Sequence, residues 1–495
     1  MKRNNGASTN PAPAVHNREV ALHRKQNPMM ELKGKKVLVV GLGKSGLAAA
    51  LFLRRHGAQV TVSDVRSAES LAKDIPALLE EGIMVEAGGH GLLTFRRQDL
   101  IVVSPGVPLE TPELVQARNF GRAVIGELEL AARFLQGRTL AITGSNGKTT
   151  TTSLIGEILE AAGFPTLVGG NIGVPVIALI DEATPDTWSV LEVSSFQLES
   201  TEQFHPHIAV ILNITPDHLD RHGTFENYAR AKERIFAAQT ADDFVVLNAD
   251  NARAAAAAPR APSRVYWFSL DRTVPQGAFV DAGQIVFRSG KDTPVEVILP
   301  LHSIPLKGEH NVENVLAAVC AARLAGAPIE AIRRAVEKFK AVEHRLEFVA
   351  TINGVEFYND SKATNVDATA KAIAAFSTPI HLILGGKDKN SDYTQLTQLL
   401  REHVRAVYTI GSAAAKIESQ LRGTVSIHSC ETLDKAVTAA ATAARPTEVV
   451  LLAPACSSFD QFESYEHRGR VFKELVNEWS AFSGLPVAAE RTRTS

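Results

Sequence analysis

The residues with the clearest capacity for chemistry lie in one glycine-rich turn, Thr143-Gly-Ser-Asn-Gly-Lys-Thr-Thr150. A short apolar run precedes the turn, and a helical pattern follows Lys148. Backbone N–H groups of such a turn, with the positive end of the helix behind them, form a cradle for phosphate oxygens. Lys148 is placed to reach the β- and γ-phosphates, and the Thr149 hydroxyl is placed to bind Mg²⁺. The spacing Gly-x-x-Gly-Lys-Thr is shorter than that of the common phosphate loop, so a tight strand-to-helix turn with an incidental lysine is the alternative interpretation.

Two later strand patterns also end in polar groups, Glu192 after the first and His218 after the second. If both strands are parallel neighbours of Leu140–Thr143, then Thr149, Glu192 and His218 converge at one carboxyl edge of the sheet. A carboxylate such as Glu192 is a hard oxygen ligand that suits Mg²⁺. The cluster Asp217-His-Leu-Asp-Arg-His222 would also allow a transition metal, but the phosphate loop already gives a reason for magnesium.

The segment before this loop has the pattern of a dinucleotide-binding domain. The strand Lys36–Val40 runs into Gly41-Leu-Gly-Lys-Ser-Gly46, and a second strand, Gln59–Asp64, ends in an acid placed for a ribose hydroxyl. A third strand ends at the small-residue turn Ser104-Pro-Gly106, at the edge where ligands of open α/β sheets bind. Such a glycine turn binds any pyrophosphate, so NAD and a nucleotide-sugar both fit. Glycines that only permit close packing are the third interpretation.

The segment after the loop predicts a further nucleotide contact and a second doubly wound sheet. Asn311 and Asn314 share one face of an alanine-rich helix and can hydrogen-bond a base or a phosphate, with helix capping by Asn311 as the alternative. Arg345 offers a planar cationic fork at the boundary of the last segment. Five strand patterns between residues 355 and 452 are mostly separated by helical patterns.

The composition bounds the class of protein. The 495 residues carry a formal net charge of -2 and are 45% hydrophobic and 21% charged, so no electrostatic attraction to nucleic acid or acidic membranes is expected. Three cysteines without paired spacing argue against a disulfide framework or a zinc site and suit a reducing cytoplasm. No apolar run reaches the length of a membrane span, so no membrane insertion is expected.

The two ends of the sequence predict tails. Residues 1–32 are basic, rich in Asn, Ala and Pro, and without a hydrophobic signal core, which predicts disorder. Translation from Met29 or Met30 instead of Met1 is a hypothesis for this segment. Residues 484–495 are expected to form a second tail.

Taken together, the motifs resemble those of the Mur ligase family between about Lys33 and Glu478. Eight motifs occur in the family's order: Thr143–Thr150, Gly169–Gly173, Leu191–Leu198, Thr215–His222, His310–Asn314, His344-Arg345, Asn359–Asn365 and Ser457–Gly469. The resemblance is strongest to the branch that adds D-glutamate to UDP-N-acetylmuramoyl-L-alanine.

The resemblance implies an α/β fold of three domains. These are a Rossmann-like domain for the UDP-substrate over residues 33–135, a central P-loop ATPase-like domain with a parallel sheet over 136–342, and a Rossmann-like amino-acid domain over 343–483. It implies an ATP-dependent ligase that works through an acyl phosphate in the cytoplasmic stage of peptidoglycan synthesis. The expected partners are the two substrates alone, and the expected state is a monomer.

The resemblance also implies roles for residues at matching positions. The catalytic residues would be Lys148, Glu192, His218 and Lys232. Two Mg²⁺ ions would be held by Thr149, Glu192, His218 and a carbamylated Lys232. ATP would contact Gly144, Ser145, Asn146, Gly147, Lys148, Thr149, Thr150, Asn311, Asn314, Arg345 and Asp360. The UDP-substrate side would comprise Ser45, Asp64, Arg66, Ser104, Gly106, Asn171, Ser194 and Gln197. D-glutamate would contact Thr364, Lys389, Ser458 and Tyr465, with Lys387 as the alternative to Lys389.

Several other functions stay open at this point. A sister ligase adding L-alanine, a diamino acid or a dipeptide would share the ATP core, and Asp250-Asn-Ala-Arg253 is faintly similar to a signature of the diamino-acid ligase. A folate polyglutamate ligase would lack the leading domain. An NAD-dependent oxidoreductase would explain only the first segment. A non-catalytic nucleotide-binding regulator would tolerate loss of Glu192, His218 or Lys232, and all three are present.

Overall fold

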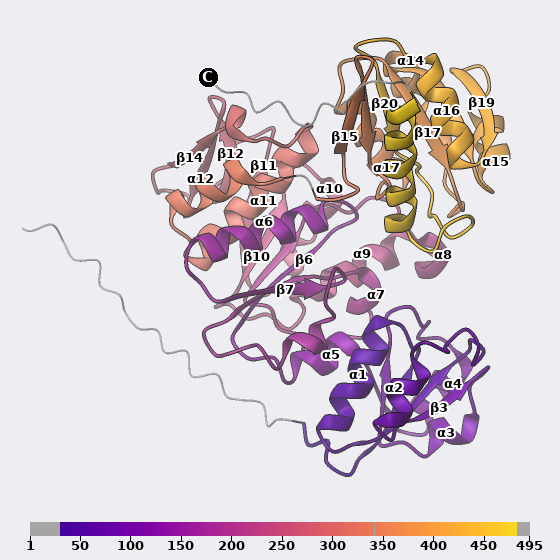
Figure 1. Cartoon of the computed structure of the whole chain (residues 1–495). Coiled ribbons are helices and arrows are strands. Elements are labelled where there is room, and N and C mark those ends of the chain that lie inside the picture. Colours follow the sequence, from indigo (N-terminus) through magenta and orange to yellow (C-terminus); the bar gives the residue numbers. More distant parts are fainter. Residues whose placement is uncertain (1–29, 341, 483–495) are drawn as a thin grey trace, which may run out of the picture.

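The computed structural model describes residues 30–340 and 342–482, and it contains three lobes that follow one another along the chain, each built on one sheet (Figure 1). Most of the predicted N-terminal tail, including the alternative start at Met29, lies outside the described residues, as does the predicted C-terminal tail. Leu32, which the sequence assigns to the tail, is buried in the core of the first lobe. None of the described helices is long and apolar enough to cross a membrane.

The first lobe is a five-stranded parallel sheet in the order β3-β2-β1-β4-β5. Its elements are β1 (Lys36–Val40), α1 (Lys44–Arg55), β2 (Gln59–Asp64), α2 (Ile75–Glu80), β3 (Met84–Ala87), α3 (Leu92–Arg96), β4 (Leu100–Val103), α4 (Pro112–Asn119), β5 (Ala123–Gly126) and α5 (Glu127–Ala132). The central strand β1 is apolar on both faces because helices cover both sides of the sheet. Since β1 pairs with β4, the turns that follow these two strands lie side by side at one edge.

The second lobe holds a nine-stranded sheet in the order β14-β13-β12-β11-β10-β9-β6-β8-β7. Its strands are β6 (Arg138–Thr143), β7 (Thr166–Gly170), β8 (Trp188–Glu192), β9 (Ile208–Ile211), β10 (Phe244–Asn248), β11 (Arg264–Ser269), β12 (Gly277–Asp281), β13 (Gln284–Arg288) and β14 (Glu296–Pro300). Its helices are α6 (Lys148–Ala161), α7 (Ser195–Leu198), α8 (Leu219–His222), α9 (Phe225–Glu233), α10 (Ala252–Ala255), α11 (Glu309–Ala325) and α12 (Ile329–Lys338), with 3₁₀ turns η1 (Val176–Leu179), η2 (Arg234–Phe236), η3 (Ala258–Arg260) and η4 (Leu301–Ser303).

Strand β6 lies between β8 and β9, and both neighbours run parallel to it. This confirms the predicted convergence of three strand ends. Side chains of β6 alternate between two cores: Leu140 and Ile142 pack with α6 and α11, and Ala141 packs into the core that is shared with the first lobe. The phosphate loop is therefore fixed by a strand that is buried on both faces.

The third lobe is a six-stranded sheet in the order β15-β16-β20-β17-β18-β19. Its elements are β15 (Glu347–Ile352), β16 (Val355–Asn359), α13 (Val366–Ala374), β17 (Ile380–Gly385), η5 (Tyr393–Leu396), α14 (Thr397–His403), β18 (Val404–Ile410), α15 (Ala414–Gln420), β19 (Ser426–Glu431), α16 (Leu433–Ala443), β20 (Val449–Leu452) and α17 (Tyr465–Phe482). The five predicted strands are confirmed and form a parallel array. The antiparallel edge strand β15 is an addition that the sequence did not predict.

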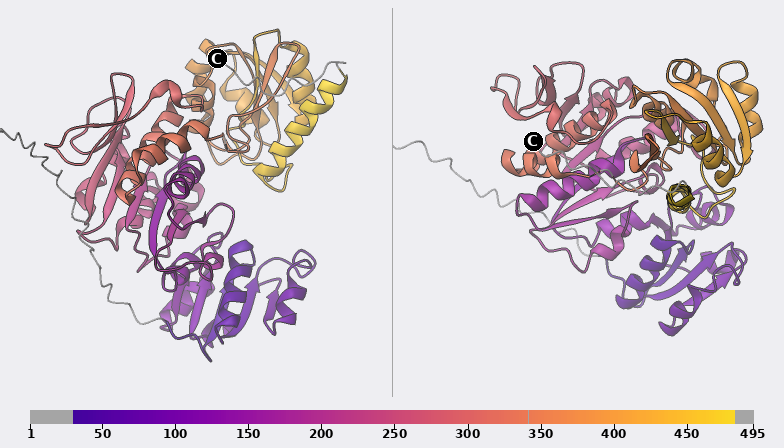
Figure 2. Two further views of the ribbon diagram at one scale, coloured as in Figure 1. Left: turned by 60° about the vertical axis from the view of Figure 1, so that its left-hand side comes forward. Right: turned by 45° about the horizontal axis from the view of Figure 1, so that its top comes forward.

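The carboxyl edges of the three sheets face a common space. The two views in Figure 2 show the first and third lobes placed on either side of the phosphate-loop end of the second lobe. Loops that follow β1, β4, β6, β7, β9 and β16 line one cavity of about 920 Å³, together with Glu192 at the end of β8. The α/β topology thus delivers residues that are far apart in the sequence to a single site.

Candidate active site

The phosphate loop occupies the turn between β6 and α6. Gly147 has φ of 86°, and a Cβ at this position would collide with the Asn314 side chain, so glycine is required there. The loop is held to the segment that follows the neighbouring strand β9, because the Asn146 N–H donates to Asn213 Oδ1 at 2.8 Å. Lys148 Nζ donates to the carbonyls of Gly144 and Ser145 at 2.9 and 3.0 Å, which holds the ammonium over the cradle.

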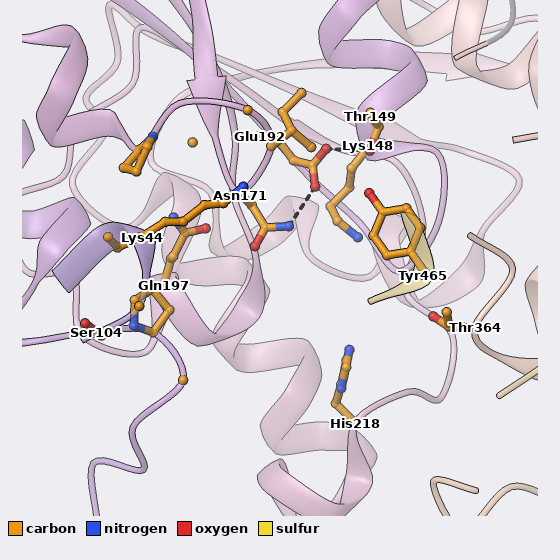
Figure 3. A pocket seen from close by; sticks show the side chains of 18 of the residues that line it. Lys44, Ser104, Lys148, Thr149, Asn171, Glu192, Gln197, His218, Thr364 and Tyr465 are labelled. Carbon is orange, nitrogen blue, oxygen red and sulfur yellow. Dashed lines mark hydrogen bonds between the residues drawn. The ribbon is translucent and has the colours of Figure 1, made fainter. Parts of the chain in front are cut away.

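Thr149 and Glu192 form the oxygen-rich part of the site. Thr149 Oγ1 donates to Glu192 Oε2 at 2.7 Å, and Asn171 Nδ2 donates to Glu192 Oε1 at 2.8 Å (Figure 3). Burial acts to raise the pKa of the Glu192 carboxyl, but Lys362 and Lys148 together with these hydrogen bonds hold the pKa below its ordinary value. A charged carboxylate beside a hydroxyl is a hard donor set that fits Mg²⁺.

His218 enters the cavity from the loop after β9, opposite Lys148 and Glu192 (Figure 3). Its backbone is left-handed, with φ of 53°, and its N–H donates to Asp217 Oδ1 at 2.9 Å. Burial lowers the pKa of His218 to about 4 against the opposing effect of Asp217, so the imidazole is neutral at pH 7. A neutral imidazole can accept a proton or bind a metal ion.

Lys232 lies behind the phosphate loop, only 1% exposed, and it does not line the cavity. Its Nζ donates to the Gly144 carbonyl at 2.8 Å, the same oxygen that Lys148 contacts, and lies 4.6 Å from the centre of the Tyr228 ring. Burial, reinforced by the charge of Lys148, lowers the pKa of Lys232 well below its ordinary value. The surroundings of Lys232 therefore stabilise its uncharged amine relative to that of a lysine in water.

A second lysine beside Thr149 comes from the third lobe. Lys362 Nζ donates to Thr149 Oγ1, and burial lowers the pKa of Lys362 to about 8. The sequence reasoning assigned no role to Lys362, although this residue lies inside the motif Asn359–Asn365 at the end of a predicted strand. A polar residue at such a position is the signal that could have identified it.

A smaller hollow next to the loop is lined by part of the set predicted to bind ATP, namely Asn146, Gly147, Asn314, Arg345 and Asp360, whereas Asn311 does not line it. Asn314 Nδ2 donates to Asn311 Oδ1 at 3.1 Å, which confirms that the two share a helix face. The capping alternative for Asn311 is wrong, because Gly308 is the N-cap residue of α11. Arg345 Nε is buried without a hydrogen-bond partner among the described residues, so a polar ligand would satisfy it.

The first lobe contributes Ser45, Asp64, Arg66, Ser104 and Gly106 to the cavity. Asp64 accepts the Leu42 N–H at 2.6 Å and forms an ion pair with Arg66 at 2.9 Å. Burial alone would raise the pKa of Asp64, but these contacts lower it to about 2. Asp64 therefore shapes the glycine turn and orients Arg66 toward the cavity.

The remaining predicted residues divide into two groups. Gln197, Thr364 and Tyr465 line the cavity, whereas Ser194 and Ser458 do not. Ser194 instead forms a capping box with Gln197 at the start of α7, and Ser458 is 3% exposed.

The two candidate lysines after β17 differ in position. Lys389 Nζ lies 3.5 Å from Asp217 Oδ1, beside His218. Lys387 is exposed and pairs through its backbone with Ser457. This geometry favours Lys389 as the residue at the site.

The transition-metal interpretation of residues 217–222 finds no support. Within the described ranges, no group of three or more His, Cys, Asp or Glu side chains is placed to hold a metal ion. His222 is engaged by Ser195 and Glu199, at 3.0 and 3.1 Å.

Comparison with known protein families assigns the chain to one family. The model of the Mur ligase MurD-like N-terminal domain matches residues 35–126, that of the Mur ligase middle domain matches residues 142–322, and that of the Mur ligase glutamate ligase domain matches residues 344–456. The chain belongs to the Mur ligase family and is an ATP-dependent ligase that forms amide bonds. This sets aside the alternatives of an NAD-dependent oxidoreductase and a non-catalytic regulator.

Relatives that align with about nine tenths of this chain share one more specific name. The UDP-N-acetylmuramoylalanine–D-glutamate ligase of Acidobacterium capsulatum is 73% identical over 447 residues, which cover 90% of this chain and 97% of that protein. The ligase of the same name from Koribacter versatilis is 61% identical over 449 residues, covering 91% and 98%. Among solved structures, the UDP-N-acetylmuramate-alanine ligase MurC from Thermotoga maritima aligns with a TM-score of 0.57 at 19% identity over 90% of this chain and 100% of that one, which shows the shared fold.

Proposed function

We propose that the chain joins D-glutamate to UDP-N-acetylmuramoyl-L-alanine with hydrolysis of ATP, the reaction named for its relatives. The observation that carries the proposal is a cavity of about 920 Å³ that all three lobes line, through the glycine turn of the first lobe, the phosphate loop and the 362–365 segment of the third lobe. A ligase must hold three reactants in one place, because the reacting groups gain most of their rate from proximity and orientation.

The reaction proceeds in two steps that this geometry can serve. An oxygen of the alanine carboxylate attacks the γ-phosphorus of ATP, and the bond between this phosphorus and the β,γ-bridging oxygen breaks. ADP departs, and the alanine carboxylate has become an acyl phosphate. The amine nitrogen of D-glutamate then attacks the carbonyl carbon, and the tetrahedral intermediate expels phosphate and releases a proton. Lys148 of the second lobe and Lys362 of the third lobe both lie at the phosphate loop, where they would stabilise the negative charge of the transferred group.

Mg²⁺ supplies further charge neutralisation at the phosphates when it is bound. Thr149 and Glu192 would hold one ion, and their contact at 2.7 Å and the low pKa of Glu192 support this assignment. The second ion would be held by His218 and Lys232. An uncharged Lys232 amine can add to carbon dioxide and lose a proton, and the resulting carbamate would turn a buried cation into an oxygen ligand.

The substrate residues are assigned by their positions in the cavity. Ser45, Arg66 and Gln197 line the cavity and would contact the UDP-substrate, and Thr364 and Tyr465 line the part assigned to D-glutamate. Lys389 does not line the cavity, but it lies 3.5 Å from Asp217, which does, and it would pair with a carboxylate of D-glutamate from there. Ser458 is buried outside the cavity and would support the loop that precedes α17.

We further infer that the protein is a cytoplasmic monomer without a nucleic-acid partner, and that its domain boundaries lie near residues 135 and 342. Light scattering on the purified protein tests whether it is a monomer.

Phosphate release across a panel of amino acids tests the proposal. Release should require ATP, UDP-N-acetylmuramoyl-L-alanine and D-glutamate together, and omission of either substrate is the control. Equal turnover with L-alanine or a diamino acid would contradict the assignment of D-glutamate.

A further inference from the structure

Arg221 joins the second lobe to the first lobe beside the cavity. Its Nη2 donates to the carbonyl of Val107 at 3.0 Å and to Glu199 Oε2 at 2.9 Å. The guanidinium also lies 5.1 Å from the centre of the Phe196 ring, and the side chain is 16% exposed. Three partners thus fix the guanidinium, and one of them belongs to a different lobe.

Val107 is part of the unit that forms the glycine turn. Its N–H donates to the Ser104 carbonyl at 3.0 Å, and Ser104 Oγ donates to the Gly41 carbonyl at 2.7 Å. The Val107 side chain packs so closely on Gly41 that a Cβ added there would lie 2.7 Å from Val107 Cγ2. A displacement of the Val107 segment would therefore displace the turn at Gly41.

The second lobe holds Arg221 on a well-anchored element. His222, the next residue of α8, contacts Ser195 Oγ through Nε2 at 3.0 Å and Glu199 Oε1 through Nδ1 at 3.1 Å. The Phe196 ring packs against His218 and His222, with ring centres 4.9 and 5.5 Å apart. The short helix α8 therefore carries Arg221 and is preceded directly by His218, which lines the cavity.

We propose that Arg221 is a positioning residue for the nucleotide-sugar: it fixes the loop after β4, and through Val107 the glycine turn, at the distance from the phosphate loop that the bound substrate needs. The inference rests on the proposed function, which places the UDP-substrate in the cavity that the glycine turn after β1 lines. It goes further by naming a residue that lines no part of the cavity yet determines the affinity for one of the three reactants.

The test compares Arg221→Ala with the wild type as full-length proteins. Calorimetric titration with UDP-N-acetylmuramoyl-L-alanine should show about a tenfold rise in Kd, the effect of losing one hydrogen bond from a charged donor. The KM for this substrate should rise in parallel, and the KM for ATP should stay unchanged. Arg230→Ala is the matched control, because Arg230 lies on the surface of α9 in an exposed pair with Glu226.

A second variant keeps the test decisive if removal of Arg221 unfolds the chain. Arg221→Lys retains the charge beside Glu199 and a donor for Val107, so its Kd should lie between those of the wild type and the alanine variant. An unchanged Kd in Arg221→Ala would overturn the inference, as would equal rises in the KM for ATP and for the UDP-substrate, or a lower kcat with both KM values unchanged. A wild type that fails to bind the UDP-substrate would instead overturn the proposed function.

Discussion

Replacement of Glu192 by glutamine should lower kcat about a thousandfold without unfolding the chain. Glutamine keeps the shape of the side chain but removes the charge that accepts hydrogen bonds from Thr149 and Asn171 at 2.7 and 2.8 Å. Two hydrogen bonds to a charged acceptor contribute on the order of 3–6 kcal/mol. We take about 4 kcal/mol, the effect of removing one preorganised electrostatic contact from an active site, which corresponds to roughly a thousandfold in rate.

The assay is phosphate release with all substrates saturating, measured over a range of Mg²⁺ concentrations. Glu192→Gln should also need more Mg²⁺ for half-maximal rate, because a neutral amide is a weaker ligand than a carboxylate. Glu160→Gln is the control, since Glu160 lies exposed at the end of the same helix that carries Thr149. A Glu192→Gln rate within about threefold of the wild type, less than 1 kcal/mol, would refute the reasoning.

Three further changes test other parts of the site. Lys232→Ala should lose activity that short carboxylic acids such as acetate partly restore in the rate assay; an unaffected variant would argue against a carbamate. Lys389→Ala should raise the KM for D-glutamate at least about tenfold, the effect of a lost charge-assisted contact, while Lys387→Ala leaves it unchanged, and the reverse pattern would move the assignment to Lys387. Burial raises the pKa of Glu127 from 4.5 to about 7, so the folded chain binds this proton more tightly than the unfolded chain. The corresponding stability is fully present below pH 4.5 and is lost as the pH rises through 7, about 3 kcal/mol in all. Glu127→Gln should flatten this part of the pH dependence in urea unfolding between pH 5 and 8, and a slope equal to that of the wild type would show that Glu127 does not titrate there.

The strands that hold the site could be predicted because their signal is local. Lys36–Val40, Gln59–Asp64 and Leu100–Val103 have the predicted bounds, since strands buried on both faces are continuous apolar runs. Strands β12 to β15 were not predicted, because β14 and β15 are partly exposed edge strands, and β12 and β13 each hold only three consecutive buried residues. Their sequences carry no comparable run.

The candidate site could be predicted where a residue follows a strand, and less well where contacts cross between lobes. Thr149, Glu192 and His218 were found because parallel strand ends meet at one edge. Lys362 and Arg221 were not assigned roles, because their importance lies in hydrogen bonds to a different lobe. Neither the hydrophobic periodicity nor the spacing of motifs in the sequence indicates a contact between two lobes.

Transfer of ¹⁸O from the alanine carboxylate of the UDP-substrate tests the central claim most directly. The two carboxylate oxygens are labelled, the complete reaction with ATP and D-glutamate is run, and the phosphate and the amide product are weighed by mass spectrometry. The account predicts that each glutamyl product retains one ¹⁸O and that each phosphate released carries the other. Label in AMP, unlabelled phosphate, or a product without the added glutamyl group would contradict it.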